Sequence, residues 1–331
     1  MRLILSVLAI LWSGFHALAN DSTAEVSVGG LALTQSEAVS LDSEDLYISR
    51  DEVRVDYKFT NTSNKDVETL VAFPLPDQTY EPDVDNFYRD LQKDLEFKTT
   101  VEGKPVDYQA VVQPMFNDQD ITEKLKAAGL PLNGLEDTDA FSAQVAALPE
   151  ATRKALLAEG LVAVNGEGTE AYYWTKWAMR TSITRTQIFP AGKTISVQHR
   201  YKPLAGGSVG GGLSLPYREE DEWARAKTKR YCVENSWYKS LDAGVEKRKT
   251  EAFPSPYSEI WLGYVLKSGA NWKGPIKDFR LVIDKGKADS MVSFCGEGVK
   301  KISPTQFEVR KMNFEPTQDL NVLIVDWWTG E

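Results

Sequence analysis

Histidine and cysteine are almost absent from this chain of 331 residues, and the two shortages exclude several kinds of site. The only histidines are His16 and His199, so a metal centre built from several imidazoles is excluded. The only cysteines, Cys232 and Cys295, are 63 residues apart and lack the Cys-x-x-Cys spacing of redox motifs and zinc sites. We therefore expect no metal and no cofactor.

Basic residues are the minority and form no long block. The chain holds 48 aspartates and glutamates against 38 lysines and arginines, which gives a formal net charge of -10. Nucleic-acid backbones are bound by basic patches, whereas the charges here are interspersed along the sequence. We expect no nucleic-acid partner.

Long apolar runs are missing except at the start of the chain. Leu3–Trp12 follows a positive Met1-Arg2, is too short to span a bilayer comfortably, and precedes the small-x-small pattern Ala17-Leu18-Ala19. This predicts a signal peptide at residues 1–19, cleaved between Ala19 and Asn20, with a retained membrane anchor as the alternative. After cleavage we expect no membrane span, and a periplasmic or secreted protein.

The two cysteines are expected to pair, because an exported protein meets an oxidising compartment. We predict a disulfide between Cys232 and Cys295. The acidic run Glu219–Glu222 precedes basic residues at 225–230, an order that suits a helix dipole. We therefore predict one further helix, which carries Cys232 near its middle.

Alternation of apolar and polar residues dominates the remaining sequence and indicates strands that bury one face. We interpret residues 52–73 and 97–112 as two hairpins. Further strands are predicted at 173–183, 194–201, 259–266, 279–283, 307–309 and 320–325. The last is nearly all apolar and should be central. The predicted fold class is mostly β, between all-β and α+β, with antiparallel β-sandwich domains.

Composition divides the chain further. Residues 118–160 are rich in Ala, Leu, Lys and Glu and predict a helical insertion, either a lid or a packed structural insert. The Gly-rich stretch 206–216 predicts a connector. It would separate an N-terminal β-sandwich domain at 20–205 from a C-terminal region of helix and strands at 217–331.

One catalytic motif matches by letter, and its context rejects it. Gly206-Gly207-Ser208-Val209-Gly210 fits the Gly-x-Ser-x-Gly elbow of serine hydrolases. An elbow needs a helix directly after the serine and a histidine downstream, whereas Gly211-Gly212 follows and no histidine comes after Ser208. No Gly-Lys-Ser/Thr follows either, so a phosphate-binding loop is excluded. We assign no catalytic residue.

The acidic clusters are interpreted as solvated loops. A calcium site at Asp83 and Asp85, or at Asp118 and Asp120, is the alternative. Neither pair has the Asp-x-Asp-x-Asn/Asp-Gly spacing of a calcium loop. We therefore expect no calcium site at either pair.

Histidine and tryptophan are expected mostly in the core. His199 shares the apolar face of its strand with Ile195 and Val197, so a buried core residue is favoured over a general base. Aromatic rings are either core mass or a flat platform for a ligand such as a glycan. The tryptophans after Trp12 are Trp174, Trp177, Trp223, Trp237, Trp261, Trp272, Trp327 and Trp328.

Short motifs in a constant order resemble a bacterial family called domain of unknown function 4424. They are NDSTAE at 20–25, GGLAL at 29–33, SEDL at 43–46, VAFPLP at 71–76, FPAGK at 189–193, NFEP at 313–316 and DLNVLI at 319–324. The resemblance implies an exported, periplasmic bacterial protein. It carries over no catalytic residue, because the family has no established activity.

These observations favour a non-catalytic binding or interaction module of the bacterial envelope, with an envelope protein or glycan as its partner. The alternative is a carboxylate-based hydrolase of envelope glycans or peptides, because paired acids work without histidine. A structural envelope component is a third possibility that the sequence does not separate from the first.

Overall fold

The computed structural model describes residues 22–27, 30–80, 94–209, 212–215, 217–220 and 222–328. The predicted signal peptide, with its cleavage site between Ala19 and Asn20, lies outside these residues, and so do Asp83 and Asp85. Within the described ranges, no helix is both long and apolar enough to cross a membrane.

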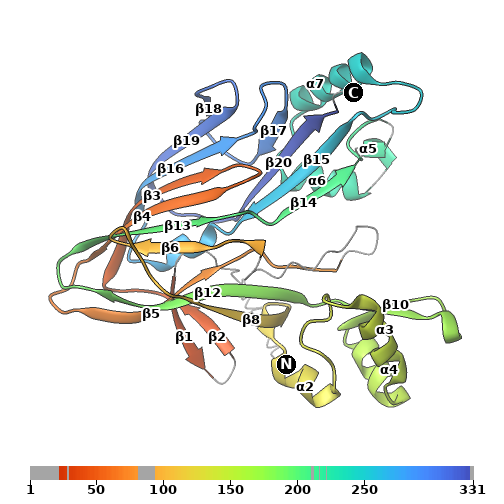
Figure 1. Ribbon diagram of the computed structural model, residues 1–331, viewed down its shortest axis with the longest axis horizontal. Coiled ribbons are helices and arrows are strands. Elements are labelled where there is room, and N and C mark those ends of the chain that lie inside the picture. The colour runs from red at the N-terminus through yellow and green to blue at the C-terminus, as the bar shows by residue number, and fades with distance from the viewer. Residues whose placement is uncertain are drawn as a thin grey trace, which may run out of the picture.

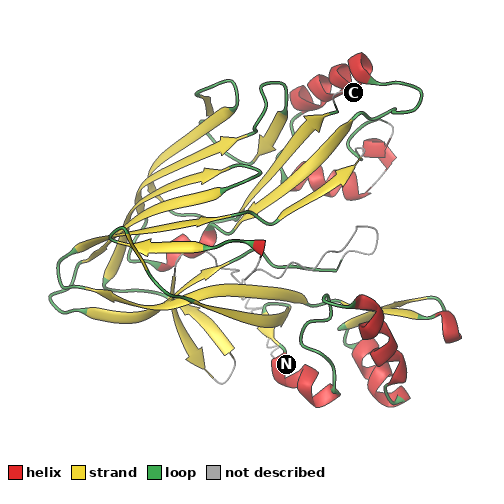
Figure 2. Cartoon of the chain, viewed as in Figure 1, coloured by secondary structure: helices red, strands yellow, loops and turns green. Residues whose placement is uncertain are grey.

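Antiparallel sheets make up most of the molecule, which confirms the predicted fold class (Figure 1, Figure 2). A six-stranded sheet contains, in spatial order, β2 (Gly30–Thr34), β1 (Ser22–Ser27), β5 (Val67–Pro74), β12 (Ala178–Phe189), β8 (Gln109–Phe116) and β9 (Gln119–Asp120). An eight-stranded sheet contains β18 (Lys300–Lys301), β19 (Gln306–Phe314), β16 (Ile276–Asp284), β3 (Val39–Ile48), β4 (Val53–Asn61), β13 (Thr194–Tyr201), β6 (Lys98–Val101) and β7 (Lys104–Pro105). A four-stranded sheet contains β14 (Ala205–Val209), β15 (Tyr257–Tyr264), β20 (Leu320–Trp327) and β17 (Met291–Phe294).

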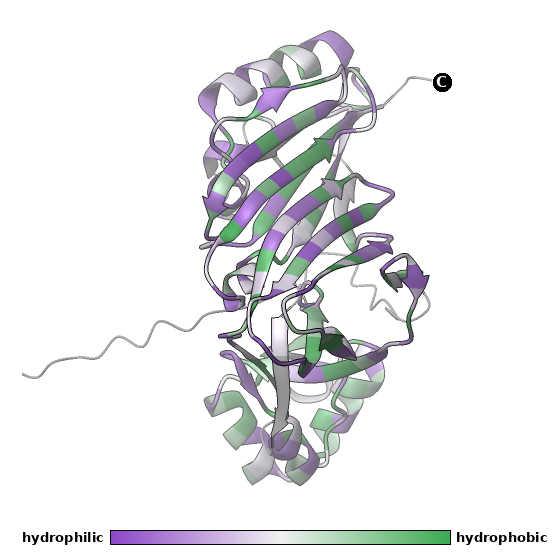
Figure 3. Cartoon of the chain, turned by 90° about the vertical axis from the view of Figure 1, so that its left-hand side faces the viewer, coloured by the Kyte–Doolittle hydropathy of each residue, from purple (hydrophilic) through white to green (hydrophobic). Residues whose placement is uncertain are grey.

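One large core lies between these three sheets. The strands of the eight-stranded sheet alternate hydrophilic and hydrophobic residues (Figure 3), and the apolar ones, such as Tyr57 and Phe59 of β4, are buried. Phe73 of β5 and Phe189 of β12 meet them from the six-stranded sheet. Leu262 of β15 belongs to the same core, so all three sheets bury one face together.

The predicted hairpin at residues 52–73 is wrong. β4 pairs with β3 and β13, whereas β5 pairs with β1 and β12 in the other large sheet. The connection is held by buried Asn61, whose Nδ2 donates hydrogen bonds to the carbonyl oxygens of Lys65 at 2.7 Å and Phe189 at 2.8 Å. Turn residues mark where a strand ends, and they do not determine which sheet the next strand joins.

The predicted hairpin at residues 97–112 is correct only in its first half. β6 pairs with β7 across Glu102 and Gly103, whose φ angles of 49° and 73° fit a tight hairpin turn. After β7 the chain leaves the eight-stranded sheet and enters β8 of the six-stranded sheet. Residues 106–108 therefore cross from one sheet to the other.

The helical insertion is confirmed and has a core of its own. It consists of α2 (Thr122–Ala128), α3 (Thr138–Ala147), α4 (Glu150–Ala158) and the ribbon β10 (Val162–Asn165) with β11 (Tyr172–Thr175). Trp177 is fully buried there against Phe141. At its base, the Arg180 guanidinium donates two hydrogen bonds to Asp77, at 2.9 and 2.7 Å, and one to Asp118 at 3.2 Å.

Helices cover the outer face of the four-stranded sheet (Figure 2). They are α5 (Tyr217–Glu220), α6 (Glu222–Arg230) and α7 (Asn235–Arg248). The predicted disulfide between Cys232 and Cys295 is present. Its predicted place near the middle of a helix is wrong, because α6 ends at Arg230 and Cys232 has a left-handed φ of 50°. The disulfide therefore joins the turn after α6 to the end of β17.

A buried ion pair attaches α6 to this sheet. The Lys227 Nζ lies 2.5 Å from the Glu259 Oε2, and the two side chains are 7% and 0% exposed. The Trp261 Nε1 donates to the same oxygen at 3.0 Å, and the Lys227 ammonium lies 3.8 Å from the centroid of the Trp261 ring. Burial of the two charges is tolerable because each has a close partner.

The Gly-rich stretch begins as a strand. Ala205–Val209 forms the edge strand β14 and pairs with β15. A Cβ atom at Gly207 would lie 2.8 Å from the Glu259 carbonyl oxygen, so only glycine fits this close approach. Strands from both sides of 206–216 share the eight-stranded sheet, as β3 and β16 show by pairing in parallel. The division into two domains stays a prediction.

Removal of the disulfide should destabilise the fold without changing it. In the double variant Cys232→Ser/Cys295→Ser we expect a loss of up to about 4 kcal/mol in the free energy of unfolding, because the bond closes a long loop in the unfolded chain. Urea unfolding measures this loss. Thiol titration of the denatured, unreduced protein should find no free thiol, and two free thiols would contradict the disulfide.

Alanine at Gly244 should destabilise α7, although this exchange normally stabilises a helix by about 1 kcal/mol. A Cβ atom there would lie 2.3 Å from the Cη2 atom of Trp327, whose ring is packed under the helix. We expect a loss of about 1–3 kcal/mol from overpacking, measured by urea unfolding. Ser240→Ala, an exposed position of the same helix, is the matched control. A stabilised Gly244→Ala variant would contradict the packing.

Neutralising Lys227 should be costly. Lys227→Met leaves the Glu259 carboxylate buried without its cation, and we expect a loss of about 3–5 kcal/mol in unfolding free energy. The control is Lys124→Met, which breaks the half-exposed pair with Glu159 and should cost less than about 1 kcal/mol. The double variant Lys227→Met/Glu259→Met should recover much of the loss. Equal effects at Lys227 and Lys124 would show that the buried pair is unimportant.

Candidate functional site

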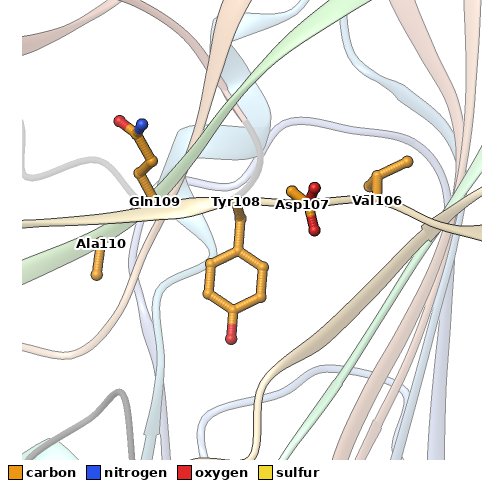
Figure 4. A pocket seen from close by; sticks show the side chains of 5 residues that line it. All are labelled: Val106, Asp107, Tyr108, Gln109 and Ala110. Carbon is orange, nitrogen blue, oxygen red and sulfur yellow. The ribbon is translucent and has the colours of Figure 1, made fainter.

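An open pocket of about 680 Å³ lies where the chain crosses between the two large sheets. Its lining includes the consecutive residues Val106, Asp107, Tyr108, Gln109 and Ala110 (Figure 4). The segment is extended, so successive side chains alternate in direction, and Figure 4 shows Tyr108 and Ala110 pointing away from Gln109. The volume is within the range of small-molecule sites.

Tyr108 is the fixed element of this pocket. Its hydroxyl donates a 3.0 Å hydrogen bond to the carbonyl oxygen of Phe97, and its ring meets the Phe97 ring edge-on at 5.3 Å. The Phe97 ring in turn stacks on Tyr201 at 5.5 Å and contacts His199 at 5.3 Å. Because these rings belong to the main core, Tyr108 is half-buried and oriented before any ligand arrives.

Behind these aromatic rings lies a buried polar centre. The hydroxyls of Tyr57 and Tyr264 are 2.9 Å apart, and the Tyr264 hydroxyl donates to the Glu44 carboxylate at 3.3 Å. Burial raises the pKa of Tyr264 and of Tyr201 well above the usual value for a tyrosine, so both hydroxyls stay protonated. His199 is 1% exposed, which confirms its predicted place in the core.

The side chains of the pocket are suited to recognition. Asp107 and Gln109 are exposed and offer a carboxylate and an amide for hydrogen bonds, and Tyr108 offers the face of a ring. Val106 and Ala110 add apolar contact. Among these five residues there is no pair of a nucleophile and a base, which acyl transfer would require.

Ser208 does not form a nucleophile elbow. It lies within the edge strand β14, directly opposite Glu259 of β15 in the register. An elbow requires a sharp turn from strand to helix at the serine, and here the strand continues to Val209. The rejection of the motif from its sequence context therefore agrees with the structure.

Asp118 and Asp120 both have structural partners. Asp118 accepts from Arg180, as described above. Asp120 accepts hydrogen bonds from Gln113 at 2.7 Å and from the backbone N–H of Thr122 at 2.8 Å, at the start of α2. In the described part of the chain, no three histidine, cysteine, aspartate or glutamate side chains are grouped as a metal site would need.

The buried acids of the described residues do not converge. Glu44 lies in the main core beneath Tyr264, whereas Glu259 is on the opposite face of β15 with Lys227. The third, Asp326, accepts from Ser290 at 2.5 Å and from Arg50 at 3.1 Å. Each carboxylate has separate partners, so the paired acids of a glycoside hydrolase are not assembled from these three.

Most tryptophans lie in or against the three cores. Seven have described side chains, and Trp223 does not. Trp177, Trp272 and Trp327 are core members, and Trp237 and Trp261 pack against the helix-covered core. Trp174 and Trp328 are half-buried outside these clusters.

Sequence reasoning missed the pocket because it placed residues 106–112 in a hairpin strand. A usable signal was present in Pro105, which removes a backbone donor and often marks the end of pairing. Nothing local indicated that the chain would change sheets there.

The motifs behind the family resemblance lie at architectural positions. Phe73 and Phe189 are core residues, and Gly192 has a φ of 62° in the turn that follows β12. Asp319 accepts hydrogen bonds from the backbone N–H groups of Leu266 at 3.1 Å and Lys267 at 3.2 Å, and its burial raises its pKa. These motifs therefore specify turns and core positions.

Comparisons with known proteins agree with the resemblance. A solved structure from Legionella pneumophila, described as a "putative nutrient binding protein", is similar at 14% identity with a TM-score of 0.44, over 88% of this chain and 68% of that one. No curated protein matches. The family model described as domain of unknown function (DUF4424) matches residues 19–323, and the chain therefore belongs to that family.

Proposed function

We propose that the protein is an exported, non-catalytic binding module of the bacterial envelope, and that the pocket along Val106–Ala110 is its binding site. The observation that carries this proposal is the chemistry of the pocket, which combines a preoriented tyrosine ring with an exposed carboxylate and amide. Export is supported by the disulfide, which persists in oxidising compartments, and by the signal-peptide pattern.

The ligand that fits this chemistry best is a glycan of the envelope. A sugar ring presents an apolar C–H face to an aromatic ring, and its hydroxyl groups both donate and accept hydrogen bonds, as Asp107 and Gln109 require. The pocket is open, so it suits one end or one residue of a larger molecule.

Oligosaccharides released from envelope material and labelled with a fluorophore provide the test. The immobilised mature chain should retain a fraction of them. Tyr108→Ala should lower the affinity roughly tenfold, and Asp107→Asn by a smaller factor, because each removes one recognition contact. Asp51→Asn, at a fully accessible acid far along the chain, is the matched control and should bind normally.

Two outcomes would overturn the proposal. One is retention that is equal in the wild type and in both pocket variants. The other is detection of turnover of the oligosaccharides by the purified protein together with no retained fraction. Unfolding curves of each variant establish that any loss of binding arises in the folded state.

A further inference from the structure

The end of the four-stranded sheet carries an exposed apolar tip, defined here as Leu215, Phe253 and Trp328. Phe253 is 53% exposed and Leu215 is 50% exposed. Phe253 is the only aromatic residue among the large hydrophobic side chains that are exposed in the described part of the chain. Its ring meets the half-buried Trp328 ring edge-on at 5.4 Å.

The tip is held by local hydrogen bonds. The backbone N–H of Phe253 donates to the Thr250 carbonyl oxygen, and the N–H of Thr250 donates back to the Phe253 carbonyl oxygen at 3.0 Å. The Trp328 Nε1 donates to the Ser258 hydroxyl at 2.8 Å, and the Ser255 hydroxyl links the loop to Ser214, beside Leu215. An exposed aromatic ring fixed in this way costs little conformational entropy when it binds.

Cations directly precede the tip. Lys247, Arg248 and Lys249 end α7, and the segment from Glu246 to Glu251 carries three cations against two acids. This small positive excess occurs in a chain of formal net charge -10. Lys247 and Lys249 are exposed, so their ammonium groups are accessible to phosphate.

The size of the tip favours a lipid surface over a protein partner. A stable protein interface buries roughly 1,200 Å² or more, which three side chains do not supply. A membrane interface needs only a few aromatic and aliphatic groups beside basic residues. Figure 1 shows the loop after α7 at one extremity of the molecule, where a flat surface can reach it.

We propose that this tip docks on an anionic phospholipid bilayer. Phe253 and Leu215 enter the interface between headgroups and acyl chains, and Lys247 and Lys249 lie near the lipid phosphates. The attachment is peripheral and reversible, because the apolar area is small and the charges are screened by salt. It leaves the pocket along Val106–Ala110 free, since that pocket lies between the large sheets.

Co-sedimentation of the mature chain with vesicles tests the proposal. Vesicles of phosphatidylglycerol and phosphatidylethanolamine should bind the protein at low salt, and vesicles of phosphatidylcholine alone should bind it more weakly. Phe253→Ser should lower partitioning about tenfold. Lys247→Ala and Lys249→Ala should each lower it about fivefold on the anionic vesicles. Higher salt should weaken binding of the wild type.

Ile188→Ser is the matched control, because Ile188 is 52% exposed but belongs to β12 of the six-stranded sheet. It should bind like the wild type. Leu215→Ser provides a second tip variant in case Phe253→Ser unfolds. Absence of binding to the anionic vesicles, or equal binding by tip and control variants, would overturn the proposal. A dimer that Phe253→Ser abolishes, without vesicle binding by the wild type, would overturn it in favour of self-association.

Discussion

Burial of one face by three sheets in a single core is the constraint on which the rest of this structure depends. The six-stranded and eight-stranded sheets meet across rings such as Phe59, Phe73 and Phe189, and the four-stranded sheet joins them through Leu262. A sheet with one exposed apolar face is unstable in water, so no two of these sheets would suffice once the third presents its inner residues. The insertion and the helices α5–α7 then cover surfaces that this arrangement leaves open.

The polar groups inside the molecule are consistent with a scaffold. Glu44 accepts from Tyr264, Glu259 from Lys227 and Trp261, and each contact joins elements distant in sequence. Buried charges and hydroxyls need such partners, because an unpaired one costs several kcal/mol. Their separation into different cores explains why a protein rich in acids has its most buried carboxylates in structural roles.

The pocket and the apolar tip share one physical property, which is that binding groups are fixed by structure made for other reasons. Tyr108 is oriented by Phe97, a core ring, and Phe253 by a hydrogen-bonded turn against Trp328. Rigid support of a few exposed groups lowers the entropy lost on binding. A binding module built this way presents separate surfaces to a soluble ligand and to a membrane.

The sequence by itself determined which side chains face inward, as for Ile195, Val197 and His199 of β13, because alternation is a local property of a strand. It also determined the helical insertion and, with only two cysteines, the disulfide. Only the tertiary structure decided that β4 and β5 separate, that residues 106–110 line a pocket, and that Lys227 meets Glu259. Periodicity and turn residues report burial and chain reversal, whereas the choice of partner depends on contacts between residues far apart in the chain.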